Sequence, residues 1–438
     1  MDKFLLSYLE KKYGVGVNTP LYKAATELLK RLWQGSVCIP ADDSLANSAA
    51  VGRSDRDRNR PLIFDNGNLY IQKYFVYQER ILKRLGELKF HIITGGPGTG
   101  KTTSLANILK GKDIETISLA APTGKAALRM TQSLANQGIE KESKTLHRLL
   151  GGYNQLDAKI IAVDECSMID LSMMSKLLNA VPNDCDLYLL GDKNQLASVE
   201  AGSVFADLCE KYKGNDKVYD ERTKGFRLPP GIDKLSKQIL SGDVKSFENE
   251  DVHYFQNDKL SAEVFNRYDV LFNAENEKAA LDFLETFQIL CATNVGKYGT
   301  IQVNRELCNL AKQKKAKYTP IIITENNYSL NLFNGDVGVM DKEFAYFYSG
   351  KDGIKSFQAL TLPTHSDAFA ITIHKSQGSE YDDVAVVYPD SELEKEFLTR
   401  ELLYTAITRA KKKCFIFGDE NVLLKSCEHP IIRASGIK

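Results

Sequence analysis

The chain has 438 residues and balances 57 Lys and Arg against 57 Asp and Glu, so its formal net charge at pH 7 is zero. This length predicts about two or three domains, while the charge balance neither supports nor excludes nucleic acid, since binding needs only a local basic channel. No apolar run approaches the roughly 18 residues of a membrane span, and a charged N-terminus unlike a signal peptide predicts a soluble cytoplasmic protein. The eight cysteines form no C-x-x-C pair and no zinc spacing, which favours reduced thiols.

Residues 1–75 predict a small N-terminal region of helices and a hairpin. Apolar residues recur at helical spacing through about residue 35. Residues 41–61 are polar and rich in turn formers, which indicates a linker or a mobile loop. An Asn66-Gly67 turn between two short apolar runs then predicts the hairpin.

Residues 76–215 predict a first α/β domain. A helix over about 74–88 leads into apolar strands that alternate with helical or loop segments. The strands are expected at 90–94, 116–121, 160–164 and 186–191. This alternation predicts a parallel sheet with helices on both faces, and ligands bind such sheets at the carboxyl ends of the strands.

Residues 216–299 and 366–438 predict a second αβ domain that ends in a strand near residues 414–417. Between these two parts, residues 300–365 alternate in the manner of strands, with apolar or aromatic residues at every second position. We expect them to form a small β-rich insert, for which a barrel is one available form.

The segment 95–102 reads GGPGTGKT and matches the phosphate-binding pattern G-x-x-x-x-G-K-[ST]. Its backbone N–H groups must curl around phosphate oxygens, which requires glycines, and the helix that follows directs its positive dipole end at the anion. Lys101 is expected to contact the β- and γ-phosphates, and the Thr102 hydroxyl is expected to bind Mg²⁺. The predicted nucleotide-binding residues of this segment are Gly95, Gly96, Pro97, Gly98, Thr99, Gly100, Lys101, Thr102 and Thr103.

An acidic pair, Asp164 and Glu165, follows the apolar run 160–163. Carboxylates at a strand end are costly without a cation, so we expect Asp164 to be a direct or indirect Mg²⁺ partner. Glu165 is placed to orient or deprotonate an attacking water. Together with the phosphate loop, the pair predicts a nucleoside-triphosphate hydrolase.

Further motifs follow in a fixed order. They read LAAPTGK at 119–125, TLHRLL at 145–150, GDKNQL at 191–196, TIHKSQGSE at 372–380 and YTAITRA at 404–410. This order and wording resembles the superfamily 1 helicases, and is most similar to the RecD family, whose members form the alpha subunit of exodeoxyribonuclease V. The resemblance spans about residues 60–418. It implies two RecA-like domains with an SH3-like insert, ATP as the cofactor, a 5′-to-3′ DNA motor activity, and RecB- and RecC-like partners that supply the nuclease.

Several roles in the nucleotide site are expected from these motifs. The neutral amide of Gln195 suits a sensor of the γ-phosphate, and the Arg409 guanidinium suits an arginine finger that reaches across the cleft between the domains. Gln78 can read adenine through its amide, although a helical surface glutamine is an alternative. Arg227 and Gly378 are also expected to contact the nucleotide.

Nucleic-acid contacts are expected in the motifs that line the strand channel of the family. Hydroxyls, imidazoles and lysines suit phosphate and sugar contacts without sequence readout. An alternative for His147 and His374 is a buried polar position in the core. The predicted contact residues are Pro122, Thr123, Lys125, Thr145, His147, Arg148, His374, Lys375 and Gln377.

The chain departs from the family pattern at two places. Gly225 stands where the fourth motif has an arginine, so Arg222 or Arg227 must substitute. The interval 151–159 is short for a strand-separating hairpin, which makes translocation a firmer expectation than duplex separation. An autonomous helicase and a nucleotide-binding scaffold with weak turnover are the two alternative functions.

Overall fold

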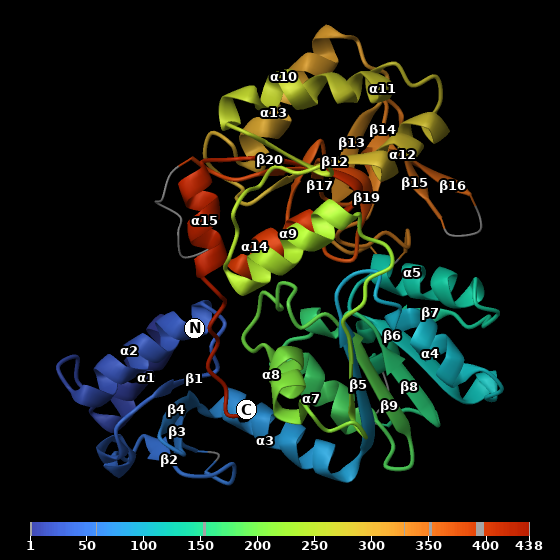
Figure 1. Cartoon of the computed structure of the whole chain (residues 1–438). Helices are drawn as coiled ribbons and strands as arrows, with labels where there is room; N and C mark the ends of the chain where they lie inside the picture. Colours follow the sequence, from blue (N-terminus) through green and yellow to red (C-terminus); the bar gives the residue numbers. More distant parts are fainter. Residues whose placement is uncertain are drawn as a thin grey trace.

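The structure is a computed structural model that describes residues 2–57, 59–151, 155–327, 329–349, 353–390 and 398–437 (Figure 1). Two large sheets, each with helices on both faces, are drawn one above the other, and the N-terminal region lies beside the lower one. This is the expected α/β fold with two RecA-like parallel-sheet domains. In the described part of the chain, no helix is both long enough and apolar enough to cross a membrane.

The N-terminal region packs two helices against a small sheet of order β1-β4-β3-β2. Its elements are α1 (Asp2–Tyr13), α2 (Pro20–Trp33), β1 (Cys38–Pro40), β2 (Val51–Gly52), β3 (Leu62–Asp65) and β4 (Asn68–Ile71). The predicted hairpin is confirmed: β3 and β4 pair antiparallel around Asn66 and Gly67, whose φ angles of 46° and 74° are left-handed. The expectation of a linker over 41–61 is wrong in part, because β2 pairs there with β3. A two-residue strand in a polar segment leaves no periodic signal.

The first large sheet is entirely parallel and has the order β10-β5-β9-β8-β6-β7. Its strands are β5 (Lys89–Gly95), β6 (Ile117–Ala121), β7 (Ser143–Thr145), β8 (Ile160–Val163), β9 (Asp186–Gly191) and β10 (Tyr219–Arg222). The four expected strands are present. Because β10 pairs with β5, the first domain extends to Arg222, and the expected domain boundary at 215–216 is too early.

Helices cover both faces of the first sheet, and a separate apolar cluster fills each side. The helices are α3 (Gln72–Glu87), α4 (Lys101–Leu109), α5 (Gly124–Ala135), α6 (Leu146–Leu150), α7 (Leu171–Ala180) and α8 (Val204–Tyr212). Leu177 of α7 and Phe205 of α8 pack on one face, whereas Leu105 of α4 and Met130 of α5 pack on the other. This two-sided burial explains why the strands are continuous apolar runs.

The second large sheet is also parallel, with the order β11-β20-β19-β12-β18. Its strands are β11 (Val252–Phe255), β12 (Phe287–Cys291), β18 (Ala370–Thr372), β19 (Tyr381–Val387) and β20 (Ala410–Phe417). The surrounding helices are α9 (Pro230–Ser241), α10 (Leu260–Val264), α11 (Asp269–Phe272), α12 (Glu277–Thr286), α13 (Thr300–Gln313), α14 (Arg400–Ile407) and α15 (Glu420–Glu428). Helices α9, α14 and α15 share a cluster on one face, and α10 to α13 share a cluster on the other.

The insert is an antiparallel sheet of order β16-β15-β14-β13-β17. Its strands are β13 (Thr319–Ile323), β14 (Val337–Met340), β15 (Phe344–Tyr348), β16 (Ile354–Gln358) and β17 (His365–Asp367). The expectation that strands begin at residue 300 is wrong, since α13 occupies that stretch and buries Val303, Leu307 and Ala311 at four-residue spacing. An SH3-like form stays a prediction.

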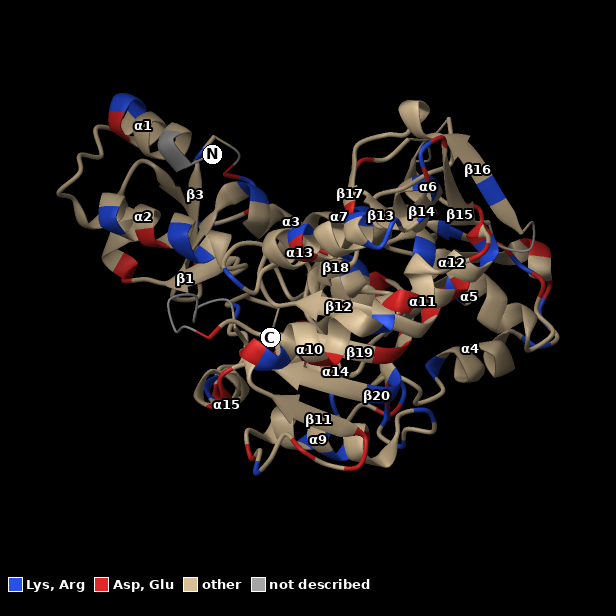
Figure 2. Ribbon diagram, turned by 90° about the horizontal axis from the view of Figure 1, so that it is seen from above, with Lys and Arg blue, Asp and Glu red and all other residues tan. Residues whose placement is uncertain are grey.

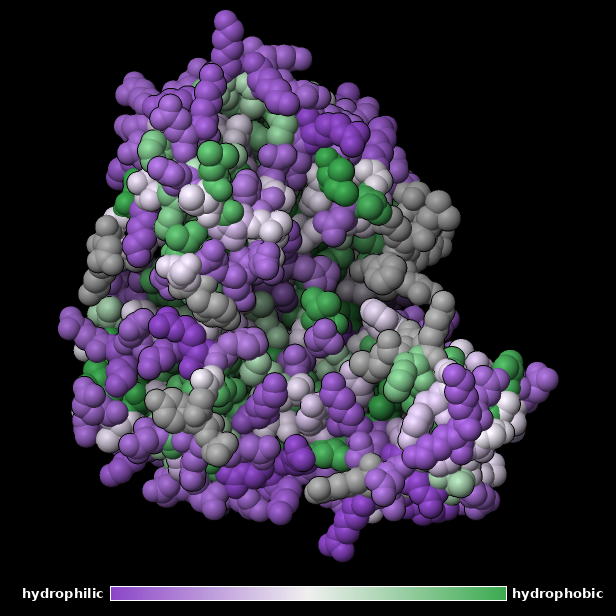
Figure 3. Space-filling view, turned by 180° about the vertical axis from the view of Figure 1, so that it is seen from behind, coloured by the Kyte–Doolittle hydropathy of each residue, from purple (hydrophilic) through white to green (hydrophobic). Residues whose placement is uncertain are grey.

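Surface charge follows the balance of the sequence. Figure 2 shows Lys and Arg interspersed with Asp and Glu over every part of the ribbon. The face seen in Figure 3 is mostly hydrophilic, with apolar residues in small groups. A binding site for a polyanion must therefore be a local feature of a cleft.

Candidate nucleotide-hydrolysis site

The phosphate loop lies where β5 ends and α4 begins, at the carboxyl edge of the first sheet. Gly98 and Gly100 have φ angles of 70° and 83°, which favour glycine. The Lys101 ammonium donates to the carbonyl oxygens of Gly95 at 2.7 Å and Gly96 at 3.1 Å. The cation thus lies across the loop, close to the position that a phosphate anion needs.

The acidic pair follows β8 directly. Glu165 has a left-handed φ of 53°, an uncommon value for a residue with a side chain, which redirects the chain at this point. Desolvation in the cleft and the neighbouring Glu165 raise the pKa of Asp164, whereas Lys101 opposes this rise. A carboxylate that is disfavoured in this way gains from a cation beside the phosphates.

The side chains of Gln195 and Arg409 are in contact although the two residues belong to different domains. The Arg409 guanidinium donates to Gln195 Oε1 at 2.7 Å, and its other nitrogens donate to the carbonyl oxygens of Thr405 and Ser379. Arg409 is only 2% exposed. The structure therefore brings the predicted sensor and the predicted finger into direct contact.

A second bond across the same boundary was missed by sequence reasoning. The Tyr404 hydroxyl of α14 donates to Asp192 Oδ2 at 2.8 Å, and the Gln195 amide donates to the same oxygen at 3.3 Å. Burial raises the pKa of Asp192, partly offset by Lys101. A Cβ at Gly96 would lie 3.0 Å from the Tyr404 hydroxyl, so the tyrosine reaches the phosphate loop. Asp192 lies in the GDKNQL motif and Tyr404 lies in the YTAITRA motif, so the motifs themselves pointed to this region. The sequence analysis assigned roles only to Gln195 and Arg409 in these two motifs.

The structure distinguishes the two candidate arginines of the fourth motif. Arg227 lies against the loop: a Cβ at Gly98 would be 2.4 Å from Arg227 Cβ, and the Phe226 N–H donates to the Gly98 carbonyl at 3.0 Å. Arg227 also pairs with Glu380 at 2.6 Å. Arg222 pairs instead with Asp220 on a partly exposed strand.

Gln78 does not face an open nucleotide cleft. Its side chain is 2% exposed, and its Oε1 accepts a hydrogen bond from the Gly436 N–H at 2.8 Å. Beyond α15, the C-terminal segment returns to the first domain, where the Lys211 ammonium donates to the Ile437 carbonyl at 2.9 Å (Figure 1). The adenine role of Gln78 stays a prediction, and it requires this segment to move.

The residues predicted to contact DNA come from both domains. Thr123 and Thr145 cap the first turns of α5 and α6, accepting from the N–H groups of Ala126 and Arg148. The Gln377 amide donates to the Leu196 carbonyl at 3.0 Å, so it joins the second domain to the Gln195 loop. His147 and Arg148 are exposed, which removes the buried-core alternative for His147.

Three cationic or imidazole groups of this set sit in crowded surroundings. His374 and Lys375 are exposed, yet partial desolvation lowers the pKa of both. Desolvation, followed by Arg129, lowers the pKa of Lys125 to about 8. Its ammonium lies 5.7 Å from the Tyr381 ring centroid. Lys125 therefore loses less hydration than an exposed lysine does when an anion binds it.

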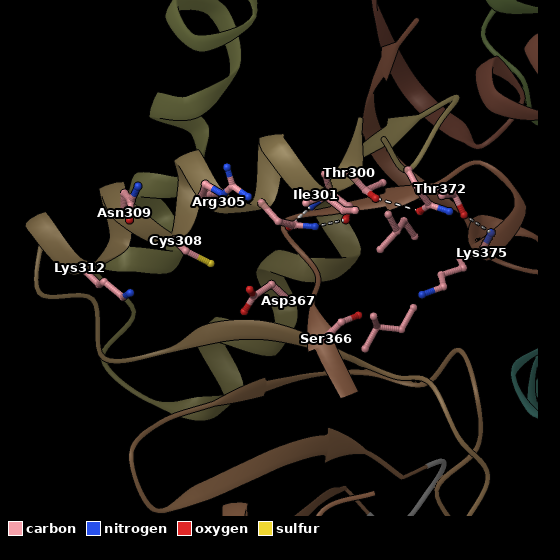
Figure 4. A pocket seen from close by; sticks show the side chains of 15 residues that line it. Thr300, Ile301, Arg305, Cys308, Asn309, Lys312, Ser366, Asp367, Thr372 and Lys375 are labelled. Carbon is pink, nitrogen blue, oxygen red and sulfur yellow. Dashed lines mark hydrogen bonds between the residues drawn. The ribbon is translucent and has the colours of Figure 1, made fainter. Parts of the chain in front are cut away.

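Lys375 also opens onto a cavity of about 470 Å³ between α13 and strands β17 and β18. Figure 4 shows Lys375 and Thr372 at one end, and Lys312 of α13 at the other. Ser366 and Asp367 of β17 face α13 across it. The cavity extends from the TIHKSQGSE motif to strands β13 and β17 of the insert, and polar and apolar residues both line it.

The fold and the site define a nucleotide-hydrolysing motor of the superfamily 1 helicase class, with the residues predicted to be catalytic divided between two RecA-like domains. Residues 78–201 match the AAA domain model, and residues 367–417 match the UvrD-like helicase C-terminal domain. The chain is 33% identical to RecBCD enzyme subunit RecD of Mycobacterium tuberculosis, over 95% of this chain and 80% of the relative. The RecD subunit of Mycolicibacterium smegmatis is 34% identical, over 79% of this chain and 71% of that relative. The chain belongs to the RecD family.

More distant similarities extend to related motors. The ATP-dependent RecD2 DNA helicase of Deinococcus radiodurans is 27% identical, over 78% of this chain and 48% of that protein. The structure of Bacteroides Pif1 helicase in complex with ADP-AlF3 and ssDNA aligns with a TM-score of 0.45 at 17% identity, covering 80% of this chain and 93% of that one.

Proposed function

We propose that this chain is an ATP-dependent 5′-to-3′ DNA helicase and translocase that acts as the alpha subunit of exodeoxyribonuclease V, in double-strand break repair and recombination. RecB- and RecC-like subunits are its expected partners, since the similar mycobacterial proteins are named RecBCD enzyme subunit RecD. The direction of movement follows from family membership alone. The observation that carries the motor activity is the 2.7 Å bond from Arg409 to Gln195 across the two domains.

ATP binding begins at the phosphate loop in this proposal. The Lys101 ammonium exchanges the carbonyl oxygens of Gly95 and Gly96 for phosphate oxygens, and the first turn of α4 offers its free N–H groups. The Thr102 hydroxyl and the Asp164 carboxylate are hard oxygen donors that suit Mg²⁺, which when bound neutralises phosphate charge. Glu165, in its redirected backbone position, orients and deprotonates the attacking water.

Closure of the two domains completes the site. Arg409 turns from Gln195 toward the developing charge on the γ-phosphate, while Gln195 reports whether that phosphate is present. Arg227 supplies the second guanidinium, because it already lies against Gly98. Hydrolysis removes the shared anion, and the domains can then separate, which couples turnover to movement.

DNA lies across the motifs that face the cleft from both domains. Residues 122–125 and the first turn of α6 supply contacts from the first domain, and His374 and Lys375 supply them from the second. The cavity beside the insert, with Lys375 at one end and Lys312 at the other, continues this path. Contacts of this type hold phosphates and sugars without reading sequence.

The test is steady-state ATP hydrolysis with and without single-stranded DNA, using Lys101→Ala as the blank. It is run on the isolated chain and on the chain purified with its nuclease partners. DNA-stimulated turnover in either form supports the proposal. Turnover of the isolated chain that persists in Lys101→Ala refutes it, as does wild-type turnover that in both forms is no higher than that of the variant. An autonomous helicase predicts full turnover and unwinding by the isolated chain, and a scaffold predicts nucleotide and DNA binding without turnover.

A further inference from the structure

Glu380 is a single carboxylate held by arginines from two parts of the molecule. Its Oε1 pairs with the Arg227 guanidinium at 2.6 Å, and its Oε2 pairs with the Arg129 guanidinium. The Glu380 side chain is 12% exposed, whereas those of Arg129 and Arg227 are 36% and 34% exposed. Burial alone would raise the pKa of Glu380, but Arg129, Arg227 and Arg409 together lower it.

Arg129 lies on α5, the helix that also carries Lys125, one of the predicted DNA contacts of the first domain. Helix α5 begins at Gly124, directly after Thr123, and Arg129 lies in its second turn. Arg129 also donates to the Gly378 carbonyl of the second domain at 3.1 Å. The contact between these parts is close, because a Cβ at Gly378 would lie 3.6 Å from both Thr123 Oγ1 and Ala126 Cβ.

Arg227 stands at the other side of the same carboxylate, beside the phosphate loop. Its Nε is buried without a hydrogen-bond partner in the described part of the chain. A buried guanidinium nitrogen without an acceptor costs free energy, and a γ-phosphate oxygen beside Gly98 would supply one. One carboxylate balances these arginines, so the cluster carries excess positive charge that favours a further anion.

We propose that Arg129 is a positioning residue that couples the nucleotide site to the DNA-contacting helix through Glu380. Both arginines share this carboxylate, so a γ-phosphate that draws Arg227 away leaves Arg129 as the ion-pair partner of Glu380. Glu380 is then free to move with Arg129, which shifts α5 against the turn at Gly378. ATP and DNA thereby change each other's affinity, as linkage requires. This coupling rests on the proposed motor function.

The experiment measures the dissociation constant of the full chain for a fluorescent oligo-dT, with and without a non-hydrolysable ATP analogue. The wild type gives a ratio of the two constants that differs from one. Arg129→Gln brings this ratio to about one and lowers DNA stimulation of ATP hydrolysis about tenfold, while its DNA-free turnover stays within about twofold of wild type. Arg129→Lys keeps the charge but loses the fork that reaches both acceptors, so it restores part of the ratio. Arg80→Gln, on an exposed position of α3, is the matched control.

The outcomes separate the coupling from the function on which it rests. A wild-type ratio in Arg129→Gln overturns the coupling. Equal weakening of both constants with a lowered Tm also overturns it, since that pattern is structural damage. The proposed function fails if wild-type ATP hydrolysis does not exceed that of Lys101→Ala, either alone or with its partners. The coupling then fails with it.

Discussion

Tyr404→Phe is the sharpest test of how the two domains dock. The change removes one oxygen, which donates at 2.8 Å to the buried carboxylate of Asp192. Asp192 then keeps the Gln195 amide at 3.3 Å and the Asn194 N–H at 3.0 Å, and both of these groups belong to the first domain. The lost bond is therefore one that joins the domains.

A hydrogen bond to a charged group contributes about 1.5–3 kcal/mol net. At about 1.4 kcal/mol for each factor of ten, its loss lowers the equilibrium constant for docking roughly tenfold to a hundredfold. If catalysis requires docking, kcat at saturating ATP and DNA falls by at least about tenfold. ATP binding to the phosphate loop changes less, because Lys101 and its glycines remain.

The assay is steady-state ATP hydrolysis at saturating single-stranded DNA, with thermal unfolding measured alongside. Tyr388→Phe is the matched control, because Tyr388 is likewise a buried tyrosine, and the polar group that its hydroxyl meets is Ser426 of the same domain. Removal of the Tyr388 hydroxyl is expected to be neutral. A kcat of Tyr404→Phe within about twofold of wild type would refute the reasoning and show that the other bonds between the domains, such as those of Arg409 and Gln377, suffice for docking.

Three further predictions concern charge in the same cleft. Glu165→Gln is expected to keep nucleotide binding and to lower kcat by at least about a hundredfold, since an amide cannot take the proton of water; wild-type turnover in a rapid-quench assay would contradict this role. The arginines hold the pKa of Glu380 below its usual 4.5, so its stabilising contribution is present above that value and is lost as pH falls through the lowered pKa. Unfolding by denaturant should thus be less acid-sensitive in Glu380→Gln, and an unchanged pH profile would remove Glu380 from the account. The Lys125 ammonium, with a pKa of about 8, is charged at pH 7 and largely neutral at pH 9. The salt dependence of single-strand binding should therefore weaken by about 0.7 in log–log slope over that range, and Lys125→Arg should abolish the change.

Much of the first domain was predictable because its signals are local. The four apolar strands, the phosphate loop and the acidic pair each lie within a few consecutive residues, and the hairpin turn needs only Asn66 and Gly67. The strands β2, β7 and β10 escaped prediction because short strands in polar sequence carry no period. Helix α13 was assigned to the insert because the strand pattern that follows it was extended too far toward the N-terminus.

The sequence by itself determined the class of this protein. The phosphate loop, the acidic pair and the ordered motifs are contiguous stretches of sequence, and the phosphate loop, the acidic pair and the GDKNQL motif each follow a strand of the first sheet. Only the tertiary structure decided that Arg227 lies against Gly98 while the Arg222 guanidinium pairs with Asp220, that Tyr404 docks on Asp192, and that Gly436 covers Gln78. The last two contacts join residues 212 and 358 positions apart. Such pairings depend on how two separately folded sheets and a returning C-terminal segment pack together, which no local spacing encodes.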